Sequence, residues 1–172
     1  MFKSISNFNN VNDYLSILNG VLITDLCVIF LLIFGFIKSK VLIQWYKKYN
    51  LSAVIADVLI IVIGIIIARF VYPHVFGEKF CIIKFIGLAV CIQIVHDILF
   101  YYIFKMVPRG KNMMLDTFKD YANEVGFNAV LSDSLMMIMA CLLSSYFVSL
   151  SLNTNIIILI ISVYILPYAI YN

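Results

Sequence analysis

The chain has 172 residues, of which 64% are hydrophobic and 12% are charged, whereas soluble domains contain about 45–50% apolar and about 25% charged residues. This composition predicts an integral membrane protein and excludes an ordinary soluble enzyme domain. A membrane-spanning helix needs about 20 residues, so the chain has room for about five, and residues 1–172 are predicted to form a single transmembrane bundle. The net charge of +3 is small, and its distribution between spans favours a role in topology over nucleic-acid binding.

Five apolar segments are predicted to cross the membrane as helices, which makes the fold an all-α, polytopic helix bundle. The predicted spans cover about residues 15–37, 52–72, 80–104, 128–150 and 155–171. The fifth segment carries no charged residue, and we therefore expect it to be the most lipid-facing of the five.

The link over residues 38–50 joins the first two spans and combines four lysines with Trp45 and Tyr46. Aromatic and basic residues together are typical of a segment that lies at the membrane surface. We expect this link to lie on the membrane surface.

The link over residues 105–127 is predicted to contain a turn followed by a short amphipathic helix. Asn112 can cap a helix over about residues 113–125, on which Met113, Met114, Phe118, Tyr121 and Val125 share one face, and Gly126 follows its end. We expect this helix to lie along the interface.

Eight of the twelve Lys and Arg residues lie in these two links. The positive-inside rule therefore places both links in the cytosol, the N-terminus outside and the C-terminus inside. Seven of the eight are predicted to face lipid headgroups or a partner: Lys38, Lys40, Lys47, Lys48, Lys105, Arg109 and Lys111.

Each of the first four spans contains one acidic residue: Asp25, Asp57, Asp97 and Asp133. A charge in hydrocarbon costs roughly 2.5 kcal/mol or more, so it needs a partner, a water-filled cavity or a function. The helical rise places Asp57, Asp97 and Asp133 in one layer roughly 7–12 Å below the cytosolic surface, with Asp25 deeper. Arg69 lies toward the outer end of its span and is not expected to neutralise this layer.

Polar neighbours extend the layer into a predicted intramembrane network. Gln93, His96 and Asp97 follow the i, i+3, i+4 spacing of one helix face, and Ser134 is adjacent to Asp133. The predicted network consists of Asp25, Asp57, Gln93, His96, Asp97, Asp133 and Ser134.

Three interpretations of this network are open. The carboxyls can be neutral groups that join helices by dry hydrogen bonds, or they can form a site that handles protons or cations together with His96. A metal site is the third, but the chain has only two histidines, His74 and His96, and we expect neither a metal nor a cofactor. A path of water to the carboxyls would favour transport.

Enzyme chemistry lacks its usual signatures in this sequence. Membrane di-iron oxygenases need several histidine boxes, thiol oxidoreductases need C-x-x-C, and phosphate-binding loops need a glycine-rich turn. None of these patterns is present, and we expect a protein without enzymatic activity.

A stretch over residues 96–139 carries a resemblance to known proteins. It contains H-D-x-x-F-Y at the end of a span, a P-x-G-x-N turn, F-K-x-Y-A in the amphipathic helix, and D-S-x-M-M in the next span. In the order of these elements it resembles uncharacterised multi-span membrane proteins of nucleocytoplasmic large DNA viruses. The resemblance covers about a quarter of the chain and implies a viral or host-derived membrane, such as the inner membrane of a virion or a host intracellular membrane.

The function expected from the sequence is a structural or scaffolding role in such a membrane. Its partners would be the lipid bilayer, anionic lipids, a capsid protein or copies of itself, and nucleic acid is not among them. The alternative is a small proton or cation channel or transporter that uses the intramembrane Asp and His residues.

Overall fold

The computed structural model describes residues 2–171, and within that range the regular secondary structure consists of seven helices and no strand. The predicted all-α class is thereby confirmed. The helices are α1 (Asp13–Ile33), α2 (Lys40–Tyr49), α3 (Leu51–Phe76), α4 (Ile82–Met106), α5 (Met113–Val125), α6 (Asn128–Phe147) and α7 (Leu152–Ile170).

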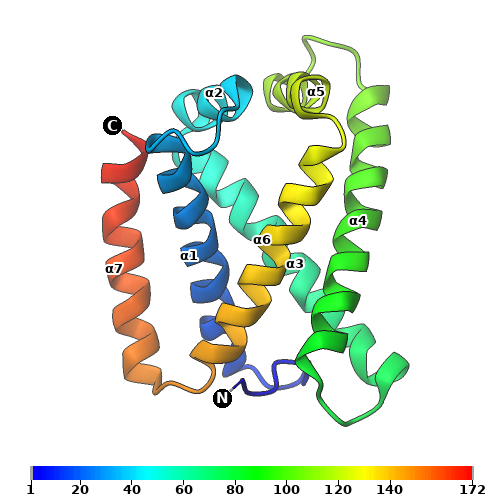
Figure 1. Ribbon diagram of the computed structural model, residues 1–172, viewed down its shortest axis with the longest axis vertical. Helices are drawn as coiled ribbons and strands as arrows, with labels where there is room; N and C mark the ends of the chain where they lie inside the picture. Colours follow the sequence, from blue (N-terminus) through cyan, green and yellow to red (C-terminus); the bar gives the residue numbers. More distant parts are fainter. Residues whose placement is uncertain (1, 172) are drawn as a thin grey trace.

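Five of these helices, α1, α3, α4, α6 and α7, are long and apolar enough to cross a membrane. The two short helices, α2 and α5, lie side by side at one end of the bundle, roughly across the direction of the long helices (Figure 1). The protein is thus a multi-pass membrane bundle with two helices that cover one of its ends.

The most buried helix is α1, which packs against α3, α6 and α7. Helix α4 lies on the side of the bundle opposite α7 and contacts α3, α5 and α6 (Figure 1). Contrary to our expectation, α4 and not α7 is the most lipid-facing helix, because 17% of its most apolar stretch is buried against 28% for α7. Helix α7 is held more closely because its polar Asn155 bonds to α1.

The helices begin and end within four residues of the predicted spans, and the larger differences have local causes. Helix α1 stops at Ile33 because Gly35, with φ of 75°, turns the chain out of the helix. Helix α3 continues through Pro73 to Phe76, since a proline in the last turn removes only one hydrogen bond. Helix α7 begins at Leu152, where the Ser151 hydroxyl accepts a hydrogen bond from the Thr154 N–H.

The link over residues 38–50 forms a helix that the sequence analysis had described only as a surface segment. Ser39 caps its start by accepting a hydrogen bond from the Leu42 N–H at 3.1 Å. A single residue, Asn50, separates α2 from α3 and adopts a φ of 49°. This sharp corner folds α2 back over the end of the bundle.

Helices α1 and α6 approach each other most closely at Gly20. A Cβ atom placed there would lie 2.5 Å from the Ser144 Oγ and 2.6 Å from its backbone nitrogen. Only glycine allows this contact, and the Ser144 hydroxyl bonds to Ala140 O in its own helix at 2.6 Å.

We predict that Gly20→Ala destabilises the protein by about 1–3 kcal/mol, because the added methyl group overlaps the backbone of α6. The matched control is Gly87→Ala in α4, where a Cβ would meet nothing within 4 Å and where alanine should stabilise the helix by about 0.5–1 kcal/mol. Thermal unfolding of the two variants in detergent measures both effects. Equal melting temperatures for the two variants would contradict the close contact.

We also predict that the end of the bundle that carries α2 and α5 faces the cytosol. The test places single cysteines at Asn112 and at Glu78, in links at opposite ends, after the four free native cysteines are replaced by alanine. An impermeant thiol reagent added outside the cell should label the second position and not the first. The reverse pattern would invert the orientation.

Candidate functional site

The four intramembrane carboxyls lie in the half of the bundle below α2 and α5. Counting along each helix from that end, Asp57, Asp97, Asp133 and Asp25 are roughly 7–14 Å below it. Asp25 therefore lies at the same depth as the other three acids. The sequence analysis had placed it deeper, which is wrong. We call these four residues the acidic layer.

Helix α2 supplies partners to two of the acids. The Tyr46 hydroxyl donates to Asp25 Oδ1 at 3.0 Å, and the Trp45 indole N–H donates to Asp57 Oδ2 at 2.9 Å. Both aromatic side chains are buried, because the corner at Asn50 turns them toward the bundle. Trp45 is 3% exposed and Tyr46 is 5% exposed. Burial and the nearby Asp57 and Asp25 carboxyls raise the pKa of the Tyr46 hydroxyl, which keeps it a hydrogen-bond donor.

Helix α4 provides the second part of the layer. Asp97 Oδ1 accepts a hydrogen bond from Gln93 Nε2 at 2.7 Å and lies 3.2 Å from His96 Nδ1. Both partners belong to the same helix as Asp97. The His96 ring stacks on Phe100, with ring centroids 5.5 Å apart.

Helices α5 and α6 complete the layer. Asp133 is half-buried and makes no side-chain hydrogen bond within the described part of the chain, while the adjacent Ser134 bonds back to Val130 O at 2.7 Å. Ser134 therefore does not assist the acid, contrary to our expectation. Burial and the nearby carboxyls of Asp133, Asp57 and Asp97 raise the pKa of Tyr121, which lies over the layer from α5.

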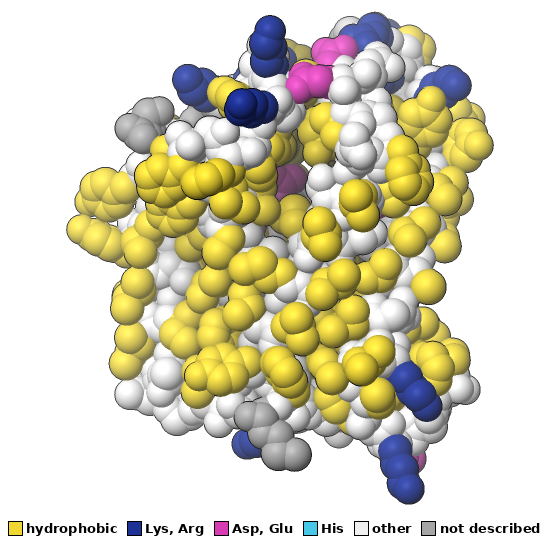
Figure 2. All heavy atoms as spheres, in the orientation of Figure 1, with side chains coloured by type: hydrophobic (Ala, Val, Ile, Leu, Met, Phe, Trp, Pro, Cys, Tyr) yellow, Lys and Arg dark blue, Asp and Glu magenta, His cyan; other side chains and the backbone are white. Residues whose placement is uncertain are grey.

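The acidic layer opens onto a hollow on one face of the protein. Figure 2 shows acidic atoms at the back of a depression below α2 and α5, within a surface that is otherwise hydrophobic at this level. Asp57, Asp97 and Asp133 are each half-buried. On the far side the layer is closed where α3 crosses α6, because a Cβ at Gly64 would lie 2.8 Å from Met137 Cε.

Two of the buried carboxyl oxygens of the layer have no hydrogen-bond partner within residues 2–171. They are Asp25 Oδ2 and Asp97 Oδ2, and both are buried. Asp25 as a whole is 0% exposed and neighbours Asp57. Within the same residues, no three His, Cys, Asp or Glu side chains are grouped as metal ligands.

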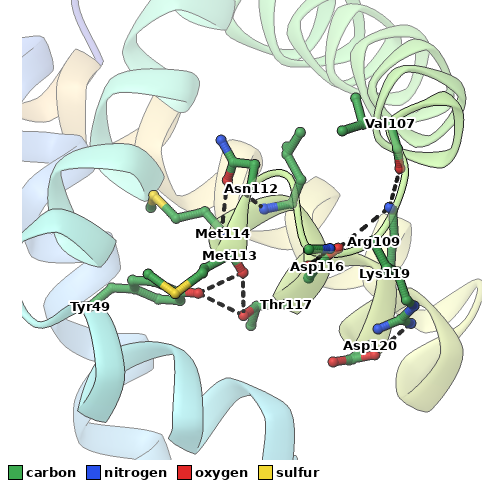
Figure 3. Close-up of polar contacts among 12 residues, drawn as sticks. Tyr49, Val107, Arg109, Asn112, Met113, Met114, Asp116, Thr117, Lys119 and Asp120 are labelled. Carbon is green, nitrogen blue, oxygen red and sulfur yellow. Dashed lines mark hydrogen bonds and ion pairs between the residues drawn. The ribbon is translucent and has the colours of Figure 1, made fainter.

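Helices α2 and α5 are joined to each other above the layer. The Tyr49 hydroxyl donates to Met113 O at 2.6 Å and lies 2.9 Å from the Thr117 hydroxyl (Figure 3). The Trp45 ring packs on Phe118, with centroids 4.8 Å apart. These contacts make α2 and α5 a continuous cover over the acidic layer.

Glu124 closes the same cover from its other end. Its two carboxylate oxygens accept hydrogen bonds from the backbone N–H groups of Lys40 and Val41 at 2.8 and 2.9 Å, at the start of α2. Although desolvation opposes it, bonding to the Val41 and Lys40 N–H groups holds the pKa of Glu124 below its usual range. Sequence reasoning missed this contact, since Glu124 carried no signal beyond its place on a polar helix face.

The opposite half of the bundle contains a buried ion pair that the sequence analysis did not predict. Arg69 of α3 is 0% exposed and bonds to Asp13 Oδ2 of α1 at 3.1 Å. Its guanidinium also donates to the backbone oxygens of Asn7 and Asn10. The sequence signal that could have found this pair is depth in the membrane. Asp13 lies at the start of α1 and Arg69 lies near the end of α3, and in antiparallel neighbouring helices these positions are at the same end of the bundle.

A second polar cluster in that half joins α1 to α7. Asn19 Nδ2 donates to Asn155 O at 2.8 Å, and the Ser16 hydroxyl donates to Asn155 Oδ1 at 3.2 Å. Together with the ion pair, it closes the bundle at the end away from α2 and α5.

Seven of the eight basic residues of the two links are exposed at the end that carries α2 and α5, and the eighth, Lys119, is half-buried. Figure 2 shows Lys and Arg side chains gathered at this end, above a broad band of hydrophobic side chains. The residues that the sequence analysis assigned to headgroups or a partner are exposed, as that role requires: Lys38, Lys40, Lys47, Lys48, Lys105, Arg109 and Lys111.

No protein family, curated protein or solved structure matches this chain. The residues of the stretch 96–139 nevertheless come together in space. His96, Asp97, Phe118, Tyr121 and Asp133 all lie in or over the acidic layer.

We predict that Phe118→Ala separates α5 from α2. The variant loses ring contacts to Trp45, Phe100 and Phe104, each worth about 0.5–1.5 kcal/mol. Trp45 is the single tryptophan of the chain, so its fluorescence should shift to longer wavelength as water reaches it.

The matched control is Phe127→Ala, which removes an exposed ring just after α5. Its emission spectrum should equal that of the unmodified protein. An unshifted spectrum in Phe118→Ala would mean that α5 does not cover Trp45.

Proposed function

We propose that this protein takes up and releases protons at the acidic layer, from the side of the membrane on which α2 and α5 lie. The observation that carries the proposal is Asp25, a fully buried carboxyl with a tyrosine hydroxyl on one oxygen and, among residues 2–171, no hydrogen-bond partner on the other. Buried ionisable groups in membrane helices are typical of proton pathways. The protein is proposed to act as a small transporter or channel without enzymatic activity.

The neighbours of each carboxyl suggest the order in which a proton moves. Asp133 and Asp97 are half-buried, and Asp133 neighbours both Asp97 and Asp57. Asp57 in turn neighbours Asp25, and the Tyr46 hydroxyl lies close to both. A proton entering from the hollow would therefore reach Asp25 last.

His96 would serve the outer part of this path. Its imidazole lies beside Asp97 and is about one third exposed, and histidine is the side chain whose charge changes most readily near neutral pH. It can pass a proton between water and the Asp97 carboxyl.

The far half of the bundle is closed in this conformation. The Arg69–Asp13 pair and the Asn19–Asn155 cluster occupy it, and both are buried. Passage across the whole membrane therefore requires these helices to move apart, which is the behaviour of a transporter with access from one side at a time.

A scaffolding role in a viral or host-derived membrane is the second candidate. The firmly bonded outer half and the broad apolar faces favour it, because both suit a rigid membrane anchor. The resemblance of residues 96–139 is what supports a viral membrane.

The test of proton uptake uses liposomes that contain the purified protein and a pH-sensitive dye, with a potassium diffusion potential as driving force. The unmodified protein should acidify the interior faster than protein-free liposomes. Asp25→Asn keeps the shape of the side chain but removes its proton exchange, and it should lower the flux about tenfold or more.

Glu78→Gln is the matched control, since it removes an exposed acid in the link between α3 and α4 and should leave the flux unchanged. A second measurement acidifies the purified protein in detergent and compares its proton uptake with the uptake of Asp25→Asn. The proposal is wrong if the unmodified protein carries no flux in liposomes and also takes up no more protons than Asp25→Asn in detergent. Scaffolding then becomes the leading function.

A further inference from the structure

A cavity of about 320 Å³ lies between the end of α4, the turn after it and α5. Its size is within the range of small-ligand sites, about 300–1,000 Å³. The cavity is separate from the acidic layer and is lined by Tyr101, Phe104, Lys105, Val107, Pro108, Arg109, Lys119, Ala122 and Asn123.

The charged groups that line this cavity are all positive. They are Lys105 in the last turn of α4, Arg109 in the turn and Lys119 on α5, and no acid of the described chain is among the lining residues. Asp120 bonds to one Arg109 nitrogen at 2.7 Å and Asp116 lies 3.5 Å from Lys119. Three positive and two negative charges leave the site with a net charge of +1.

Figure 3 shows how a backbone carbonyl and a carboxylate side chain hold two of these cations in place. Lys119 reaches from α5 to the carbonyl of Val107, and Arg109 is oriented by Asp120. Asp116 accepts a hydrogen bond from the Gly110 N–H at 2.7 Å, which ties the turn to α5. The cations are therefore positioned by the fold, although Arg109 stays 56% exposed.

The other residues that line the cavity are uncharged and mostly apolar, and exposed apolar side chains of α4 lie nearby. Phe104 and Ala122 lie at its inner side, and next along α4 are the exposed side chains of Tyr102, Leu99 and Ile98. A ligand with a negative head and apolar chains fits this surface, since its head would meet the cations while its chains follow α4.

We propose that this cavity binds one anionic phospholipid of the leaflet that faces α2 and α5, through its phosphate group. Arginine and lysine together suit a phosphate oxyanion, and basic pockets at the cytoplasmic ends of membrane helices bind such headgroups. The bound lipid bridges α4 and α5 and holds the cover above the acidic layer against the bundle.

Native mass spectrometry of the delipidated protein with equal amounts of phosphatidylglycerol and phosphatidylcholine tests the proposal. The unmodified protein should retain one phosphatidylglycerol in preference to phosphatidylcholine. The double variant Lys105→Gln/Arg109→Gln should reduce this preference about tenfold or more.

Two further variants separate the cavity from general surface charge. Lys47→Gln/Lys48→Gln removes the same charge from exposed positions on α2 at the same end. Because these lysines can meet headgroups only at an open surface, this variant should reduce the preference far less than Lys105→Gln/Arg109→Gln. Ala122→Phe fills the cavity without changing charge and should lower the preference even if the first variant folds poorly.

Three outcomes would overturn the proposal. They are equal retention of the two lipids by the unmodified protein, an equal loss in the α2 variant, and unchanged preference in Ala122→Phe. Displacement of phosphatidylglycerol by millimolar glycerol phosphate would assign the site to a soluble phosphate compound instead, whereas resistance to it supports the lipid.

Discussion

The close approach of α1 and α6 at Gly20 is the contact on which the arrangement of the other helices depends. At this contact the backbone of α1 lies directly against Ser144 of α6, because Gly20 has no Cβ atom. Helix α1 is also the helix around which α3, α6 and α7 pack. With α1 and α6 tightly joined in one half, α3 and α6 cross at Gly64 and diverge toward the end that carries α2 and α5 (Figure 1). The space between the diverging helices is where the acidic layer lies.

The two halves of the bundle treat buried polar groups in opposite ways. In one half the charge of Asp13 is matched by Arg69, and Asn155 uses its amide to bind α1. In the other half the carboxyls meet only neutral donors and one imidazole, and Asp25 and Asp97 each keep a bare oxygen. Lipid offers no hydrogen bond to compensate for such an oxygen. This difference between the halves is the reason why proton uptake is proposed for the half that contains the acidic layer.

The number of spans and the fold class could be predicted because hydropathy depends on residues close together in the sequence. The depths of Asp57, Asp97 and Asp133 could be predicted for the same reason, since helical rise converts residue number into depth. Asp25 was placed too deep because its span was predicted to continue to residue 37, whereas α1 ends at Ile33. Exact helix ends were harder: the second span was predicted to end at about residue 72, whereas α3 continues through Pro73, because a proline in a last turn is tolerated.

The partners of the acids could not be predicted, because they depend on how distant segments meet. Trp45 and Tyr46 have the composition of a membrane-surface belt, and the sequence pattern does not show that Asn50 turns them inward onto Asp57 and Asp25. Ser134 was assigned to the network by adjacency, yet a serine within a helix often bonds to the carbonyl four residues earlier, as it does here. Local spacing therefore located the acids but not their environment.

The single-residue connection at Asn50 has a mechanical consequence. Because only one residue connects α2 and α3, a tilt of the start of α3 moves α2 with it as a single rigid unit. Asp57 of α3 and its partner Trp45 of α2 belong to this unit and move together. Relative motion in the cover is thereby directed to its other boundary, the seam where Trp45 and Tyr49 of α2 meet Phe118 and Thr117 of α5.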